Sequence, residues 1–107
     1  MEAIAEAIEN KKAVDVDIID VSKLSPVTDF FIIASSLSMP QTRAITKAVD
    51  EVLEDRGAAT PRWQGKPESN WLILDLGSII VHIMGEEERK KYSLEEIWGR
   101  SGITYHR

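Results

Sequence analysis

WLILDLGSIIVHIM, residues 71–84, is the stretch that decides the fold predicted for this chain. Two apolar runs of strand length flank Gly77 and Ser78, a pair that can adopt the positive φ angles of a tight hairpin turn. We therefore expect two antiparallel strands in which Leu76 pairs with Ile79 and Trp71 pairs with Met84.

The predicted pairing divides the side chains of the hairpin into two sets, because successive residues of a strand point to opposite faces. One set is purely aliphatic and should face the core: Leu72, Leu74, Leu76, Ile79, Val81 and Ile83. The other set contains Trp71, Ile73, Asp75, Ile80, His82 and Met84. Its mixture of aromatic, thioether, carboxylate and imidazole groups is closer to a partner-binding surface than to an aliphatic interior.

The composition indicates one small globular domain. The chain has 107 residues, 43% of them hydrophobic and 29% charged, which suffices for a single core. A formal net charge of -5 argues against free nucleic acid as a partner and favours a basic protein surface.

Cysteine is absent, which excludes disulfides and thiolate metal sites. No apolar run approaches a membrane-spanning length, and the acidic start is unlike a targeting peptide, so we expect a cytosolic protein.

Hydrophobic periodicity predicts three elements in the first third of the chain. Glu2–Lys11 should form a short amphipathic helix. From Val14 to Val21 the apolar residues alternate with aspartates, which is typical of a half-solvated strand. The apolar run Asp29–Ser35 indicates a central strand that is buried on both faces.

The middle of the chain predicts one long helix and one weak strand. Ser38 and Gln41 form a capping box at the start of the helix, and Gly57 lies just beyond its end. Residues 62–64 can add only a short edge strand, because prolines and glycines surround them.

The segment after the hairpin is predicted to be mostly polar and helical. The run EEERKK, residues 86–91, should present a solvated helix face. Ser93 and Glu96 form a second capping box for a short helix in which Trp98 belongs to the core. We expect the domain to span residues 1–99 and residues 100–107 to be a mobile tail.

The order of these elements predicts an α/β fold with a mixed five-stranded sheet and helices mainly on one face. The first helix and the long helix should cover the aliphatic face of the hairpin. Too few helices remain to cover the other face, which carries Trp71, Asp75, His82 and Met84. We therefore expect that face to be exposed and functional.

Asp15 and Asp17 are the candidates for catalytic chemistry. Alternation along a strand would put both carboxylates on one face, as in the magnesium site of a nucleotidyltransferase. Such an enzyme also needs a glycine-rich phosphate loop before the pair, and none is present there. A small nucleotidyltransferase-like enzyme using Asp15 and Asp17 with magnesium is the alternative function. The simpler interpretation is that both aspartates lie on the solvated side of a strand.

Asp75 and His82 share the mixed face of the hairpin as diagonal neighbours. No serine or cysteine is placed to complete a catalytic triad with them. We expect the two residues to orient a partner surface or to satisfy each other in a half-buried sheet. Trp71 has no predicted helix to pack on and is interpreted as an interface anchor.

Four segments together point to a known family: TDFFIIASSLS (residues 28–38), QTRAITKAVDEVLE (residues 41–54), Gly65, and WLILDLGSIIVHIMGEEERKKYSLEEIW (residues 71–98). With them the chain resembles the ribosomal silencing factor family, also called RsfS or Iojap, from about Ala3 to Trp98. The most specific positions of the match are Trp71, Val81, His82, Arg89, Tyr92, Leu94, Glu95 and Trp98.

The resemblance implies a non-enzymatic translation repressor with a nucleotidyltransferase-like fold and without cofactor or metal. Members of the family bind protein fourteen of the large ribosomal subunit, on the face that joins the small subunit, and block subunit association when nutrients are short. Neither a membrane nor direct recognition of nucleic acid is expected. By motif position, the partner-binding residues would be Trp71, Asp75, Leu76, His82, Met84 and Tyr92. Of these, Leu76 disagrees with the hairpin geometry, which places it on the core face.

Two positions depart from the family pattern. Gln64 stands where many members have glutamate, and Ser78 stands where many have aspartate. Each change removes one negative charge near the predicted surface, so binding by this chain would rely less on acid–base pairing there. A homodimer formed through the same apolar face is a further expectation, and it would store the protein until the ribosomal partner competes for that face.

Overall fold

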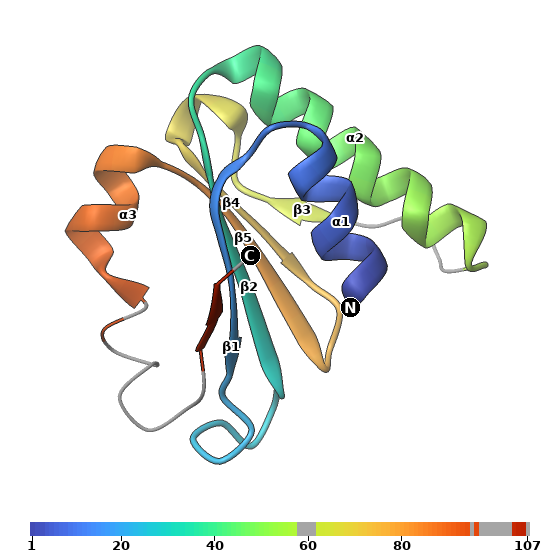
Figure 1. Cartoon of the computed structure of the whole chain (residues 1–107), viewed down its shortest axis with the longest axis vertical. Helices are drawn as coiled ribbons and strands as arrows, with labels where there is room; N and C mark the ends of the chain where they lie inside the picture. Colours follow the sequence, from blue (N-terminus) through green and yellow to red (C-terminus); the bar gives the residue numbers. More distant parts are fainter. Residues whose placement is uncertain (58–61, 95, 97–103, 107) are drawn as a thin grey trace.

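The computed structural model of the chain describes residues 1–57, 62–94, 96 and 104–106 (Figure 1). The helices are α1 (Glu2–Asn10), α2 (Met39–Asp55) and α3 (Glu86–Tyr92), and Pro67–Ser69 form a short 3-10 helix, η1. The strands are β1 (Val14–Asp20), β2 (Phe30–Ser36), β3 (Trp63–Gln64), β4 (Trp71–Asp75), β5 (Ile79–Gly85) and β6 (Thr104–His106). They form one mixed sheet in the order β3-β4-β5-β2-β1-β6. The predicted α/β fold is confirmed, with β6 in addition to the five expected strands.

The hairpin of β4 and β5 has the predicted register. Trp71 lies opposite Met84 and Asp75 lies opposite Ile80. The amide of Leu76 donates to the carbonyl oxygen of Ile79 at 2.8 Å. Gly77 has a φ of +85°, which glycine adopts without steric cost. This turn fixes which side chains of the hairpin face each layer of the protein.

One face of the sheet packs against α1 and α2, which lie together on one side of it (Figure 1). The aliphatic set of the hairpin is on this face, as predicted. The buried cluster here consists of Ile4, Ala5 and Ile8 of α1, Ile45, Val49 and Leu53 of α2, and Val16, Ile18, Ile32, Ala34, Leu72, Leu74, Val81 and Ile83 of the strands. This is the larger of the two described cores, and burial of its aliphatic side chains is the main favourable term in folding.

The other face is partly covered, which corrects the expectation that it is left open. Ile19, Val21, Phe31, Ile33 and Met84 form a second buried cluster there, and Trp71, Ile80 and Leu94 pack against it. Met84 is 1% exposed and His82 is 6% exposed, so both lie inside the protein. The central strand β2, which runs parallel to β5, is therefore buried on both faces as predicted.

Strand β1 does not alternate as the sequence suggests. A bulge shifts its register with β2 between Val14 and Asp17, and Asp15 has a φ of +50°. Because the extra residue breaks the two-residue period, Asp15 is exposed while Asp17 is buried. The expectation that both aspartates lie on the solvated side of the strand is wrong for Asp17.

Arg89 of α3 pairs with the groups that surround the bulge. Its guanidinium donates to the backbone carbonyls of Val14 and Asp15, to the hydroxyl of Ser35 at 3.1 Å, and to the carboxylate of Asp17 at 2.9 Å. Arg89 is 9% exposed, which corrects the prediction of a wholly solvated face for residues 86–91. The buried ion pair joins α3 to β1, and its burial is tolerated because both charges are paired and hydrogen-bonded.

Helix α2 begins at Ser38 as predicted, and half of the predicted capping box forms. The Ser38 hydroxyl accepts the amide of Gln41 at 3.2 Å. The Gln41 side chain instead accepts the amide of Leu37 at 2.6 Å and donates to the carbonyl oxygens of Lys11 and Lys12. Gln41 thereby ties the start of α2 to the turn that follows α1.

The C-terminal segment corrects a further expectation. Residues 104–106 were predicted to be part of a mobile tail, but they form β6 and pair antiparallel with residues 17–19 of β1. The predicted helix after Ser93 lies partly outside the described residues: Leu94 and Glu96 are helical, while Ile97 and Trp98 are not described. None of the described helices is long and apolar enough to cross a membrane.

The buried ion pair makes a testable contribution to stability. Changing Arg89 to Met should lower the free energy of unfolding by about 3–5 kcal/mol, because it leaves the Asp17 carboxylate buried without its cation. The matched control Lys90→Met alters an exposed neighbour on the same helix and should change stability by about 0.5 kcal/mol or less. Urea unfolding of both variants measures this difference, and equal losses would contradict a role for the pair.

Candidate functional site

The second face of the sheet keeps an accessible apolar area at the β4 edge of the second core. We call it the Trp71 surface, and it consists of Trp71, Ile73, Asp75 and Ile80 of the hairpin together with Tyr92 of α3. Trp71, Ile73 and Ile80 are half-buried, whereas Asp75 and Tyr92 are exposed. Strand alternation brings the four hairpin residues to one face, and α3 delivers Tyr92 beside them.

Trp71 and Tyr92 are the centre of this surface. Their ring centroids are 4.7 Å apart with the planes tilted by 43°. Tyr92 is 43% exposed, and the ammonium group of Lys91 lies 5.7 Å from the centroid of its ring. Two aromatic rings that are packed together yet accessible offer a large rigid contact area at low entropic cost.

A groove of about 380 Å³ runs beside the two rings. Its lining residues are Gln64, Gly65, Ser69, Trp71, Ile73, Glu88, Lys91 and Tyr92. Gly65 is required for this shape, because its φ is +96° and a Cβ atom there would lie 2.6 Å from the carbonyl oxygen of Trp71. The lining of the groove thus combines apolar side chains with polar ones of both charges.

His82 lies directly behind Trp71. Its Nδ1 atom accepts a hydrogen bond from the indole Nε1 of Trp71 at 3.2 Å, and its ring contacts Phe31 edge-on at 4.9 Å. Burial lowers the pKa of His82 from 6.5 to about 4, because the charged imidazolium would lose its hydration. The neutral ring is therefore the form present at physiological pH, and only that form can accept a hydrogen bond from the indole N–H at Nδ1.

The structure brings some of the six predicted partner-binding residues together and separates others. The rings of Trp71 and Tyr92 pack against each other, and Asp75 lies on the same face, where its carboxylate accepts a hydrogen bond from the amide of Gly77 at 2.8 Å and so supports the turn. His82 and Met84 are buried, so the expectation that they are exposed on this face is wrong. Leu76 packs against the cluster under α1 and α2, on the opposite face. His82 bonds to Trp71 and Asp75 bonds to Gly77, so the structure does not favour the alternative in which Asp75 and His82 satisfy each other.

Asp15 and Asp17 line the same pocket, but the Asp17 carboxylate in it is paired with Arg89. The bulge leaves Asp15 exposed and Asp17 buried, and the guanidinium of Arg89 already neutralises the Asp17 carboxylate at 2.9 Å. Among the described residues, no group of three potential metal ligands comes together. This arrangement does not favour the magnesium-dependent alternative.

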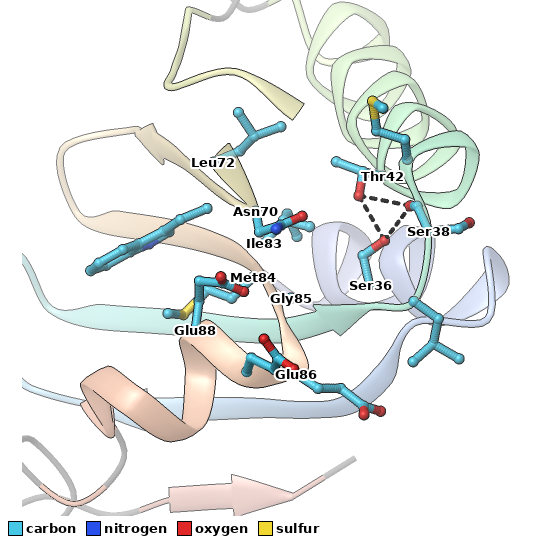
Figure 2. A pocket seen from close by; sticks show the side chains of 14 residues that line it. Ser36, Ser38, Thr42, Asn70, Leu72, Ile83, Met84, Gly85, Glu86 and Glu88 are labelled. Carbon is cyan, nitrogen blue, oxygen red and sulfur yellow. Dashed lines mark hydrogen bonds between the residues drawn. The ribbon is translucent and has the colours of Figure 1, made fainter. Parts of the chain in front are cut away.

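A second pocket, of about 230 Å³, lies at the carboxyl ends of the parallel strands β2 and β5 (Figure 2). Ligands often bind at this place in α/β sheets. Here the hydroxyl of Thr42 lies 2.7 Å from that of Ser36, which donates to the carbonyl oxygen of Ser38 at 2.9 Å. Glu86 and Glu88 line the opposite side, and no lysine or arginine is among the described lining residues. Its acidic lining is unsuited to a phosphate group.

The role of Arg89 and the packing of Tyr92 on Trp71 were not predicted from the residues. Both depend on α3 folding back over the sheet, which brings Arg89 to within 2.9 Å of Asp17 although 72 positions separate them in the chain. One sequence signal could have indicated this partner. An aspartate between apolar residues of a strand that ends up buried must find a cation or hydrogen-bond donors.

Comparison with known proteins gives a consistent result. The family model described as "Ribosomal silencing factor during starvation" matches residues 1–105. "Ribosomal silencing factor RsfS" of Bacillus subtilis (strain 168) is 31% identical over 100 residues, which cover 94% of this chain and 85% of that protein. "Protein Iojap, chloroplastic" of Zea mays is 33% identical over 99 residues, covering 92% of this chain and 43% of that protein. A crystal structure of a Chromobacterium violaceum protein is similar with a TM-score of 0.84 and 29% identity, covering 92% of this chain and 82% of that one.

Burial of neutral His82 should make stability depend on pH. The pKa of His82 is lower in the folded protein, about 4, than the ordinary value of 6.5, so the unfolded chain binds more protons between these values. The difference in pKa should add about 3 kcal/mol to the free energy of unfolding. This stabilisation should be complete above pH 6.5 and should be lost as the pH falls to 4. Urea unfolding of the parent and of His82→Phe over this range measures it as a difference. If the free energies of unfolding of the two proteins changed with pH in parallel, the proposed contribution of His82 would be refuted.

Proposed function

Since this chain belongs to the ribosomal silencing factor family, we propose that it represses translation by binding the large ribosomal subunit through protein fourteen and blocking the small subunit. The mechanism is steric. Occupancy of the subunit-joining face excludes the small subunit, and no bond is made or broken. This assigns the protein a regulatory rather than an enzymatic role, and the cytoplasm is the compartment we propose for it.

The observation that carries the proposal is the accessible aromatic pair of Trp71 and Tyr92. Tryptophan and tyrosine are enriched among the residues that dominate binding energy at protein interfaces. Here they lie next to a groove and are bordered by Ile73, so an apolar side chain of a partner can be buried against them. Met84 and His82 support this surface from within and do not contact the partner.

Charge supports a basic partner. The chain carries a net charge of -5. Glu88 lines the groove beside the aromatic pair together with Lys91, and the exposed Asp75 lies further along β4 on the same face. Complementary charge at the rim of an interface raises the association rate more than the affinity. Gln64 lines the groove where many family members have glutamate, so this chain depends more on its aromatic contacts. A homodimer, if formed, would use the same surface.

The first experiment tests whether Trp71 is a binding anchor. Trp71→Ala should weaken binding to isolated large subunits by about 2 kcal/mol or more, roughly thirtyfold in Kd, because the central apolar contact is lost. Co-sedimentation at graded subunit concentrations measures the affinity.

Trp63→Ala is the matched control. Trp63 is also half-buried and also donates its indole N–H, to Asp50 at 2.8 Å, but it packs against the core on the opposite face. This variant should lose stability and keep its affinity for large subunits. Parent-like binding by a folded Trp71→Ala variant would remove Trp71 from the interface.

The second experiment tests the steric mechanism. The protein is first incubated with large subunits, and small subunits are added afterwards. The fraction of joined ribosomes in a sucrose gradient should then fall in proportion to the fraction of large subunits that carry the protein. Added after joining, the same amount should have a much smaller effect, because the binding face is already covered. A chain that binds large subunits fully and still permits normal joining would contradict steric exclusion.

A further inference from the structure

The contact between Trp71 and His82 is a directed hydrogen bond. The two residues are diagonal neighbours across the hairpin, since Trp71 pairs with Met84 and Ile73 pairs with His82. Their ring centroids are 6.1 Å apart, while Trp71 Nε1 and His82 Nδ1 are separated by 3.2 Å. The rings therefore do not stack face to face. The indole points its N–H group at the imidazole.

The acceptor in this hydrogen bond is held rigidly. His82 lies on β5 between Ile73 of β4 and Ile33 of β2, so its backbone is paired on both sides. Its ring packs edge-on against Phe31 with an interplanar angle of 63°, and the residue is 6% exposed. An acceptor fixed in the middle of a sheet can determine the orientation of a side chain at the surface.

The protonation state of His82 is also determined by the contact. Because Nδ1 accepts a hydrogen bond from the indole N–H, the ring must be the neutral tautomer that carries its hydrogen on Nε2. Nε2 is buried and has no hydrogen-bond partner among the described residues. A buried polar group in this state is destabilising, and an apolar ring such as phenylalanine would avoid that cost. The acceptor contact with Trp71 is a reason for histidine at this position.

We infer that His82 is a positioning residue for partner binding: its buried Nδ1 atom fixes the indole of Trp71 in the orientation that docks. This inference rests on the proposed function of the Trp71 surface and deepens it. His82 touches no partner, and it acts only through Trp71. Tyr92 packs against the same indole, with its ring centroid 4.7 Å away, so the indole is held both by a hydrogen bond and by contact with a second ring.

The physical effect is preorganisation. A side chain that is already ordered before binding does not lose rotamer freedom on docking, and this saving corresponds to up to about a tenfold gain in affinity for one large side chain. Without the acceptor, the indole would sample other orientations and its N–H group would turn to water. Binding would then have to reorder it.

Three variants separate positioning from general packing. His82→Phe keeps an aromatic ring but removes the acceptor. His82→Asn places an amide oxygen near the position of Nδ1 and should restore acceptance from the indole. Trp71→Phe keeps a ring on the surface but removes the donor, so the contact cannot form whatever residue is at position 82.

Affinity for isolated large subunits is the functional readout. His82→Phe should weaken binding about tenfold in the parent background and should have no further effect in the Trp71→Phe background. His82→Asn should bind within about threefold of the parent, because it retains the acceptor. The inference is overturned if His82→Phe weakens binding equally in both backgrounds, or if it leaves binding unchanged while Trp71→Ala weakens it.

A measurement on the free protein keeps the inference testable if a variant folds poorly or if the proposed function itself fails. In nitrogen-15-labelled parent protein, a scalar coupling between Trp71 Nε1 and His82 Nδ1 should be detected across the hydrogen bond, and the indole proton should exchange with water more slowly than in His82→Phe. Trp71→Ala with parent-like affinity would reject the docking surface, whereas absence of the coupling would reject the positioning contact independently.

Discussion

The two-residue turn at Gly77 and Ser78 is the constraint on which the rest of the structure depends. It sets the register of β4 against β5, and strand alternation then sends every second side chain to the same face. A shift of one residue would move Trp71 into the aliphatic core and expose Leu72 and Leu74. The pairing of β4 with β5 therefore determines both the large core under α1 and α2 and the Trp71 surface on the opposite face.

The second face shows how a small sheet can be stable and still present a binding surface. A folded domain of this size buries only part of the surface that its unfolded chain exposes, so complete cover on both faces is difficult to achieve. Here α3 covers one end of the face, and the buried pair of Arg89 and Asp17 holds it to β1. Tyr92, at the end of the same helix, is thereby placed on Trp71. The ion pair thus orders the surface without belonging to it.

Local sequence patterns predicted the elements and pairings that local chemistry determines. The hairpin register follows from its turn, the start of α2 follows from Ser38, and the assignment of β2 to the centre of the sheet follows from its continuous apolar run. The features that were missed depend on distant partners. The bulge at Asp15 requires a positive φ at a residue other than glycine, β6 has too few residues for a periodic pattern, and Arg89 lies in a run whose other charges are exposed or half-buried. One inconsistency was visible in the sequence alone, because a central strand buried on both faces requires cover on the second face.

The central claim is that the Trp71 surface contacts the large subunit, and site-specific photocrosslinking tests it most directly. A photoreactive side chain at Tyr92, which is 43% exposed beside Trp71, should crosslink to protein fourteen in purified large subunits. The same group at Val27, which is 77% exposed in the loop between β1 and β2, should give no crosslink to that protein. Crosslinks to protein fourteen from position 27 but not from position 92 would contradict the account.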